Sequence, residues 1–180
     1  MMCGISNAQN LISIDVEKST LKWLGSSMIY FNDHYGTVEI ENGLLTTDGG
    51  KISGGTFQID MKTIRNVDGG YSESLVSHLK DGDFFDVEKY PTATIEIEKV
   101  KYHSNIRMEC FANLTIKGIT NPVTFFADVD FTNGKMRIQS KFKIDRTRWN
   151  VKYGSKSFFE DLGDKAISDV IVFEVKLIAR

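Results

Sequence analysis

Apolar and polar residues alternate along most of the chain, with the period of two that is typical of β-strands. The clearest case is residues 135–145, where lysine, arginine and glutamine residues occupy one face. The opposite face carries Met136, Ile138, Phe142 and Ile144. One face is therefore buried and the other is in water, which is typical of an antiparallel sheet. The remaining segments that we predict as strands are 13–16, 20–24, 37–47, 51–62, 92–102, 106–117, 121–131 and 168–178.

Several breaks in the alternation indicate bulges and turns. The pattern changes phase near Lys99, and it changes face across Gly54-Gly55, as a β-bulge or a barrel corner would allow. Gly49-Gly50 marks a turn, and Asn133-Gly134 between two alternating segments is a strong hairpin signal.

A single helix is predicted over residues 72–80, within a long connection that spans residues 64–91. Leu75, Val76 and Leu79 share one side of this segment, and Gly82 follows its end. About eight strands and one short helix, without repeats or a linker, predict a single all-β domain over residues 11–180, either a barrel or a sandwich.

Composition excludes several classes of function. The 180 residues carry a formal net charge of -2, from 22 basic and 24 acidic residues that are interspersed along the chain. This distribution argues against nucleic-acid binding and against a polybasic membrane anchor. No segment approaches the roughly 20 apolar residues of a membrane-spanning helix. Of the two cysteines, Cys110 lies on an apolar strand face and is predicted to be a small buried residue, so that a bridge to Cys3 is not expected.

Residues 1–10 are predicted to lie outside the folded domain. Ser6 and Ala8 stand at the -3 and -1 positions relative to Gln9, as they would at the end of a secretion signal. Two interpretations stay open: the remnant of a signal peptide, with a periplasmic or secreted protein, and a disordered terminus of a cytoplasmic protein.

No constellation of residues predicts catalysis, a metal site or a cofactor. His34, His78 and His103 share no metal-ligand spacing, and each is predicted to be a surface or turn residue. Asp145-Arg146 has two interpretations, a structural ion pair that fixes the following loop or a group that orients a ligand. Arg146 and Arg148 would share a face on a continuing strand, and a guanidinium is suited to bind phosphate or carboxylate.

Aromatic residues are the strongest candidates for a ligand site. An eight-stranded barrel is close to the size at which side chains either fill the interior or leave room for one ligand, and the sequence does not separate these cases. The residues expected to line the wall are Trp23, Phe57, Met61, Phe125, Phe142 and Phe173. Those expected to close the ends from the loops are Phe84, Phe85, Trp149, Tyr153, Phe158 and Phe159.

Four segments, in order, resemble the YceI-like family. They are residues 34–61, residues 79–93 with Asp83-Phe84-Phe85-Asp86 and Tyr90-Pro91, residues 113–123, and residues 142–165 in a version similar to that of members from Bacteroidetes. The resemblance covers residues 11–179. It implies an extended, lipocalin-like, eight-stranded antiparallel barrel that encloses a long apolar cavity.

The resemblance also implies a function and a location. Known relatives bind polyisoprenoid chains or similar amphiphiles and are exported to the periplasm. We therefore expect a lipid- or isoprenoid-binding protein rather than an enzyme, acting as a monomer or as a homodimer. Two alternatives stay open: an interaction module with a packed barrel that acts through its long loops, and a cavity enzyme that acts on a lipid.

Overall fold

The computed structural model describes residues 10–27, 33–69, 72–132, 134–163 and 166–179. Nine strands, one α-helix and one short 3₁₀ helix are assigned among these residues. The strands are β1 (Asn10–Ser13), β2 (Thr20–Ser27), β3 (Asp33–Asp48), β4 (Lys51–Asn66), β5 (Thr92–Tyr102), β6 (Arg107–Ile116), β7 (Ile119–Thr132), β8 (Lys135–Asp145) and β9 (Ile167–Ala179). The helices are α1 (Ser72–Lys80) and the 3₁₀ helix η1 (Arg146–Trp149).

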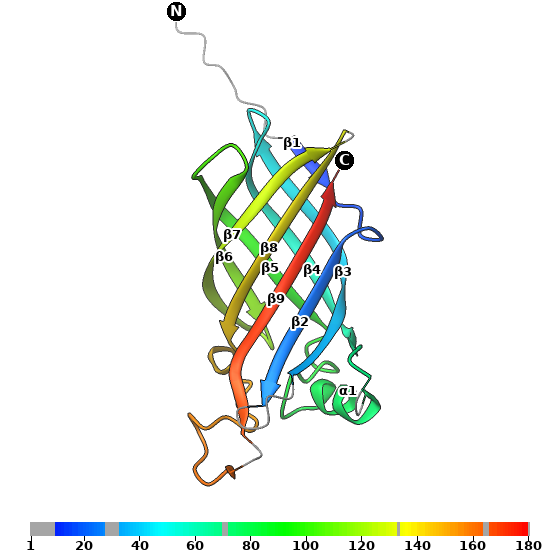
Figure 1. Cartoon of the computed structure of the whole chain (residues 1–180), viewed down its shortest axis with the longest axis vertical. Coiled ribbons are helices and arrows are strands. Elements are labelled where there is room, and N and C mark those ends of the chain that lie inside the picture. Colours follow the sequence, from blue (N-terminus) through cyan, green and yellow to red (C-terminus); the bar gives the residue numbers. More distant parts are fainter. Residues whose placement is uncertain (1–9, 28–32, 70–71, 133, 164–165, 180) are drawn as a thin grey trace, which may run out of the picture.

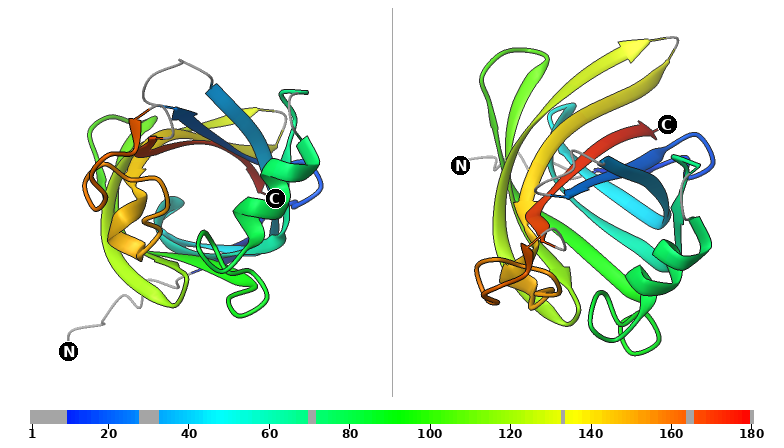
Figure 2. Two further views of the ribbon diagram at one scale, coloured as in Figure 1. Left: turned by 90° about the horizontal axis from the view of Figure 1, so that it is seen from below. Right: turned by 60° about the horizontal axis from the view of Figure 1, so that its bottom comes forward.

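The strands form one closed antiparallel barrel (Figures 1 and 2). From β2 the order of neighbours is β9, β8, β7, β6, β5 and β4, and the β3–β4 pairing closes the ring. Strands β1 and β2 both pair with β3, at its two ends, and therefore occupy one position in the ring. The barrel accordingly has eight positions, as predicted, and each of β2 to β9 pairs with a neighbour on both sides.

Most of the predicted elements are confirmed. Helix α1 has the predicted bounds, and the predicted strands from residue 20 onward correspond to β2 to β9. The phase change near Lys99 is a register shift in the β5–β6 pairing, and another shift lies opposite Gly54 in the β3–β4 pairing. Strands β7 and β8 pair out to Thr132 and Lys135, whereas Asn133 lies outside the described residues.

The predicted strand over residues 13–16 is wrong, because β1 is Asn10–Ser13 and only Ile14 makes an isolated bridge, to Ala179. Asp15 ends the extended backbone. Its carbonyl oxygen accepts hydrogen bonds from the Lys18 backbone N–H and the Ser19 hydroxyl, and its carboxylate pairs with Lys18 at 2.7 Å. Asp favours such local turns over strand pairing.

One end of the barrel, which we term the helix end, is covered by α1, by residues 81–91 and by η1 (Figure 2). The β6–β7 hairpin fixes this cover. Its two turn residues, Lys117 and Gly118, both have positive φ, at 52° and 72°, as a two-residue hairpin requires. Lys117 donates from Nζ to the backbone oxygens of Gly82 and Phe84, each at 2.8 Å. The loop is thus tied across the end of the barrel.

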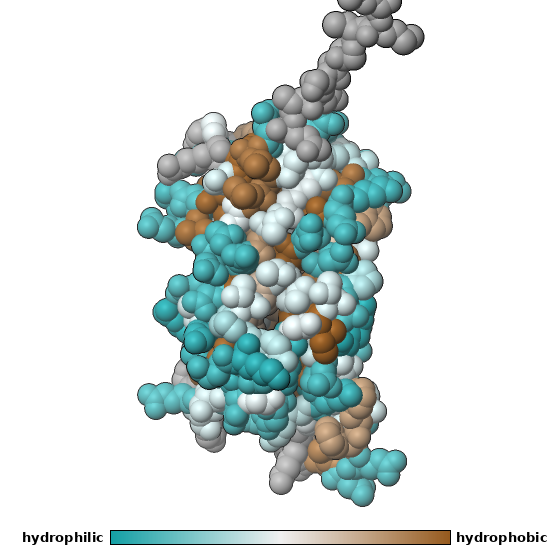
Figure 3. Space-filling model, turned by 180° about the vertical axis from the view of Figure 1, so that it is seen from behind, coloured by the Kyte–Doolittle hydropathy of each residue, from teal (hydrophilic) through white to brown (hydrophobic). Residues whose placement is uncertain are grey.

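The face of the barrel seen in Figure 3 is mostly hydrophilic, with small apolar patches. Charged residues on the outer faces form cross-strand pairs, such as Arg107 with Asp128 at 2.7 Å and Lys141 with Glu174 at 2.7 Å. Among the described residues, no helix is long and apolar enough to cross a membrane.

Candidate functional site

The barrel encloses a cavity of about 410 Å³. Its wall consists of the inward-facing residues of β2 to β9, together with residues of α1 and of the loop at the helix end. A volume of this size lies within the range of small-molecule binding sites. A barrel of eight strands can either fill with side chains or hold a ligand, and here the interior is not filled.

The middle of the cavity is aromatic. Phe125 stacks on Phe142, with ring centroids 4.7 Å apart and an interplanar angle of 20°. Phe142 in turn contacts Phe173 on β9 at 5.5 Å. These three rings come from neighbouring strands, β7, β8 and β9, and form a continuous apolar wall that suits a hydrocarbon chain.

Beyond these rings, away from the helix end, the cavity is lined by aliphatic and sulfur-containing residues. This part includes Leu45, Met108, Cys110, Ala127, Ile138 and Leu177. All six are buried, and burial raises the pKa of the Cys110 thiol to about 12. The prediction that Cys110 is a buried apolar residue is confirmed.

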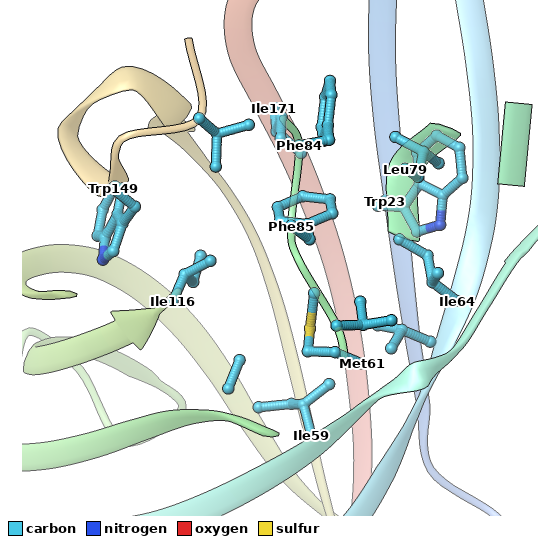
Figure 4. Packing of buried hydrophobic residues seen from close by; sticks show 14 of the residues in the cluster. Trp23, Ile59, Met61, Ile64, Leu79, Phe84, Phe85, Ile116, Trp149 and Ile171 are labelled. Atoms are coloured by element: carbon cyan, nitrogen blue, oxygen red, sulfur yellow. The ribbon is translucent and has the colours of Figure 1, made fainter. Parts of the chain in front are cut away.

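The polar lining residues gather at the helix end. They are Ser26, His34, His78, Arg146 and Ser168, whereas Ser140 alone lies farther along the barrel, on β8. The cavity is therefore amphiphilic: one end offers polar groups, and the remainder is apolar. The hydrophobic cluster around the polar end includes Trp23, Met61, Phe84 and Phe85 (Figure 4).

Trp23 lies next to this polar end, on β2. Its indole covers Gly36 on β3. A Cβ atom at Gly36 would stand 1.7 Å from the Arg65 backbone oxygen and 2.7 Å from Trp23 Cζ2, so that glycine is required at this contact. The side chain is buried, with 8% exposed, and its Nε1 has no hydrogen-bond partner among the described residues. A buried donor left unpaired costs about 1–3 kcal/mol.

His34 lies at the start of β3, on the inward face. Its Nδ1 and Asp68 Oδ2 are 2.8 Å apart, and the Asp68 carboxylate also accepts hydrogen bonds from the Tyr35 backbone N–H and from Asn66 Nδ2, at 3.3 and 2.8 Å. Because a carboxylate only accepts hydrogen bonds, Nδ1 carries the hydrogen and Nε2 of a neutral imidazole is an acceptor. The imidazole is thus held in a fixed orientation beside the cavity.

Residues from α1 and the following loop cover the polar end. Phe84 and Phe85 meet edge to face, with centroids 5.0 Å apart. The His78 ring contacts Tyr153 at 4.3 Å and Phe84 at 6.0 Å, and it therefore joins the α1 segment to the loop after η1. The cover consists of packed aromatic rings rather than of charged groups.

Arg146 is buried within the same end, with 1% of its surface exposed. It donates from Nε to Ser168 O at 3.0 Å, from Nη1 to Val151 O at 2.7 Å and from Nη2 to Ile167 O at 3.3 Å, and it pairs with Asp169 at 3.4 Å. Burial lowers the pKa of the guanidinium, and the charges of Asp169 and Asp145 oppose this shift. Its contacts join the start of β9 to the loop that follows η1.

Asp145 does not pair with Arg146. It caps η1 instead, accepting from the Thr147 backbone N–H at 2.9 Å and from the Thr147 hydroxyl. The prediction that Arg146 and Arg148 share the face of a continuing strand is wrong, because β8 ends at Asp145 and the chain turns into η1. Arg148 is exposed and donates to Pro122 O at 3.1 Å.

The predicted site residues fall into two groups. Those that line the cavity are Trp23, Phe57, Met61, Phe84, Phe85, Phe125, Phe142, Arg146 and Phe173. Those outside its lining are Arg148, Trp149, Tyr153, Phe158 and Phe159. Trp149 is fully buried and donates from Nε1 to Leu114 O at 2.9 Å, whereas Tyr153, Phe158 and Phe159 are 43–49% exposed.

The lining residues that sequence reasoning missed include both histidines at the helix end, His34 and His78, which were predicted to be surface or turn residues. His34 follows the alternation of Gly36 and Val38 on β3, so the period of two would have placed it on the inward face. His78 lies on α1, three positions after Leu75 and one before Leu79, which also line the cavity, so the helical period would have placed it toward the same side. Among the described residues, no group of three or more His, Cys, Asp or Glu side chains could hold a metal ion.

Comparison with known proteins connects this site to others. Residues 13–179 match the model of the YceI-like domain. A UPF0312 protein of Pseudomonas aeruginosa (strain LESB58) is 35% identical over 109 residues, which are 59% of this chain and 52% of that protein. A UPF0312 protein of Pseudomonas putida (strain W619) is 30% identical over 120 residues, 67% of this chain and 61% of that protein. The chain thus spans little more than half the length of these curated relatives.

Two solved structures share the fold. BcnA of Burkholderia cenocepacia superposes with a TM-score of 0.76, at 19% identity, over 93% of this chain and 99% of that one. A polyisoprenoid binding domain from Saccharophagus degradans, implicated in plant cell wall breakdown, superposes with a TM-score of 0.70, at 13% identity, over 94% and 97%. The similarity to members from Bacteroidetes stays a prediction, since none of these four relatives tests it.

Proposed function

Because the chain belongs to the YceI-like domain family, we propose that it binds one long-chain amphiphile, of isoprenoid or acyl type, inside the barrel. The observation that carries this proposal is the cavity of about 410 Å³, apolar along most of its length and polar at one end. The name of the Saccharophagus degradans domain, a polyisoprenoid binding domain of the same fold, supports the isoprenoid class.

The energy of binding would come from burial of the chain. Each methylene group that leaves water for an apolar site contributes about 0.8 kcal/mol. The free energy gained by burying ten methylene groups exceeds the lower estimates of the free energy that association costs. The stacked rings of Phe125, Phe142 and Phe173 would supply much of the contact surface.

Binding and carriage, rather than catalysis, is the role proposed for this cavity. A packed interior would have favoured an interaction module that acts through its loops, and the open interior removes that support. Export to the periplasm and assembly as a homodimer stay predictions, and the residues that would form a signal-peptide end, 1–9, lie outside the described residues.

Titration with N-phenyl-1-naphthylamine, an uncharged probe that fluoresces in apolar surroundings, tests the proposal. We expect saturable binding at one site per chain and displacement by farnesyl methyl ether. Native mass spectrometry of gently purified protein should show a lipid-sized adduct that organic solvent extracts. A chain that carries no adduct and binds neither the probe nor the ether would contradict the proposal.

Two neighbouring phenylalanines on β7 provide a matched pair of variants. Phe125 is 8% exposed and faces the cavity, whereas Phe126 is 42% exposed on the outer face. Phe125→Gln should weaken binding of the probe at least tenfold, and Phe126→Gln should leave it within about twofold, since only the first adds a polar group to the cavity. Circular dichroism of both variants checks that the barrel is retained.

A further inference from the structure

The polar end of the cavity contains a pocket between two strands. On β2, Trp23 pairs with Gly36 of β3, and Gly25 pairs with His34. Trp23 and His34 are therefore diagonal neighbours on the inward face, about 7–8 Å apart at the backbone, a separation that aromatic side chains span. Gly25 completes the pocket, because nothing lies within 4 Å of the position where its Cβ atom would stand.

The two side chains offer complementary hydrogen-bonding atoms. Trp23 Nε1 is a buried donor without a partner among the described residues, and an indole nitrogen can only donate. In the neutral imidazole, His34 Nε2 is an acceptor, because Asp68 accepts the hydrogen bond from Nδ1. A group that accepts from the first atom and donates to the second would satisfy both.

A hydroxyl group has this combination, since it carries one hydrogen and two lone pairs. An ether or ester oxygen can accept from Trp23 but cannot donate to His34. A fully ionised phosphate or carboxylate likewise only accepts.

The surrounding charges also disfavour an anion. Arg146 is the one permanently cationic side chain among the described lining residues, and it is engaged with three carbonyl oxygens and with Asp169. The carboxylate of Asp68 lies directly behind His34. An anionic head group would thus enter without a free counter-charge, which is costly away from water.

We infer that Trp23, His34 and the space over Gly25 form a head-group site for an uncharged lipid alcohol, oriented with its hydroxyl at the helix end and its chain toward the Phe125 stack. This inference rests on the proposed function, because it specifies the polar end of the same ligand. The hydroxyl is the shared chemistry of isoprenoid and straight-chain alcohols.

Three ligands that share one chain test the inference: farnesol, farnesyl methyl ether and farnesyl phosphate. With the wild-type chain we expect farnesol to bind roughly fivefold more tightly than the ether, because both oxygens can accept from Trp23 but only the hydroxyl can donate to His34, and more tightly than the phosphate. Dodecan-1-ol in place of farnesol shows whether a straight-chain alcohol is also preferred over its own methyl ether, which would likewise support a hydroxyl site.

Single substitutions test which residues cause the preference for the alcohol over the ether. His34→Phe should reduce the ratio of ether to alcohol dissociation constants to about one, while the affinity for the ether stays within about twofold. Trp23→Phe should weaken both ligands severalfold, because the alcohol and the ether both accept from Trp23 Nε1. Gly25→Ala should also reduce the ratio, because its methyl group occupies the pocket. His103→Phe is the control, since His103 lies outside the lining, at the opposite end of the barrel, and bonds to Glu109. The ratio is insensitive to a general loss of stability.

Equal binding of alcohol and ether by the wild-type chain would overturn the inference and leave the proposed function intact. Tighter binding of the phosphate, a ratio unchanged in His34→Phe, or an unchanged affinity for both the alcohol and the ether in Trp23→Phe would also overturn it. Failure of all three ligands to bind would overturn the proposed function together with this inference.

Discussion

Arg146 donates a hydrogen bond of 2.7 Å from Nη1 to the backbone carbonyl oxygen of Val151, inside the protein. The same guanidinium also contacts the carbonyl oxygens of Ser168 and Ile167. A single side chain thus satisfies carbonyl groups on two segments that are distant in sequence, the turn after η1 and the start of β9. The segment between η1 and β9 depends on this arginine for its position.

Replacement of Arg146 by Met should lower the free energy of unfolding by about 3–5 kcal/mol, because it leaves buried carbonyl groups and the Asp169 carboxylate without their partner. Urea denaturation followed by circular dichroism measures this change. Arg148→Met is the matched control: Arg148 is exposed, and its loss should cost less than about 1 kcal/mol. Equal stability of the two variants would contradict a structural role for Arg146.

The two tryptophans should differ in how much stability they lose when each is replaced by phenylalanine. Trp149 Nε1 donates to Leu114 O at 2.9 Å, whereas Trp23 Nε1 has no partner among the described residues. Trp149→Phe should therefore destabilise the chain by about 1–2 kcal/mol more than Trp23→Phe, since only the first leaves a buried carbonyl unpaired. Thermal unfolding of both variants without ligand provides the comparison, and a larger loss in Trp23→Phe would refute it.

The barrel could be predicted from the sequence because it depends on local periodicity. The alternation in β8 and the phase change at Lys99 each reflect which face of one strand is buried, and that information lies within a few neighbouring residues. A short strand that ends in a local turn contains fewer alternating positions, so its sequence gives less information about where it ends. Asp15 accordingly ends β1 earlier than the apolar pattern of residues 13–16 suggested.

The site was less predictable, since it depends on contacts between distant segments. Arg146 and Arg148 were expected on one strand face, but the cap by Asp145 turns the chain between them. The ring orientation of His34 depends on Asp68, 34 positions later, which contacts Nδ1. Whether the interior would be filled or open was also beyond the sequence, because it depends on how all eight positions of the barrel pack together.

Alkaline pH should destabilise the protein through Cys110. Its thiol has a pKa of about 12 in the folded chain, raised by burial from an ordinary value of 9.0. The folded state therefore keeps the proton that the unfolded state releases, so this stabilisation is complete below pH 9 and is lost between about pH 9 and 12. The slope approaches about 1.4 kcal/mol per pH unit for this one group.

Urea denaturation at pH 8, 9.5 and 10.5 measures this loss. In Cys110→Ala the decrease in the free energy of unfolding that begins at pH 9 should disappear. The decrease that begins near pH 10 should remain, because burial also raises the pKa of Tyr102, whose hydroxyl accepts a hydrogen bond from the Ile52 backbone N–H. If the variant loses stability from pH 9 as steeply as the wild-type chain, another group is responsible.

The apolar part of the cavity should set the length of chain that the protein accepts. Ala127 on β7 is 2% exposed and pairs with Met108 and Ser140, which also line the cavity. Ala127→Phe places a ring in the space beyond Phe125, away from the polar end. A long chain would then lose the volume for its last carbons, each worth about 0.8 kcal/mol, whereas a short chain would still fit.

Displacement of N-phenyl-1-naphthylamine by geraniol and by geranylgeraniol measures this effect. Ala127→Phe should weaken geranylgeraniol at least tenfold and geraniol by no more than about twofold. Thr124→Phe adds the same ring to the exposed outer face of β7 and should change neither affinity. If Ala127→Phe weakens neither alcohol, the chain does not extend past Phe125, and the ligand lies in the opposite direction from the one that the polar end predicts.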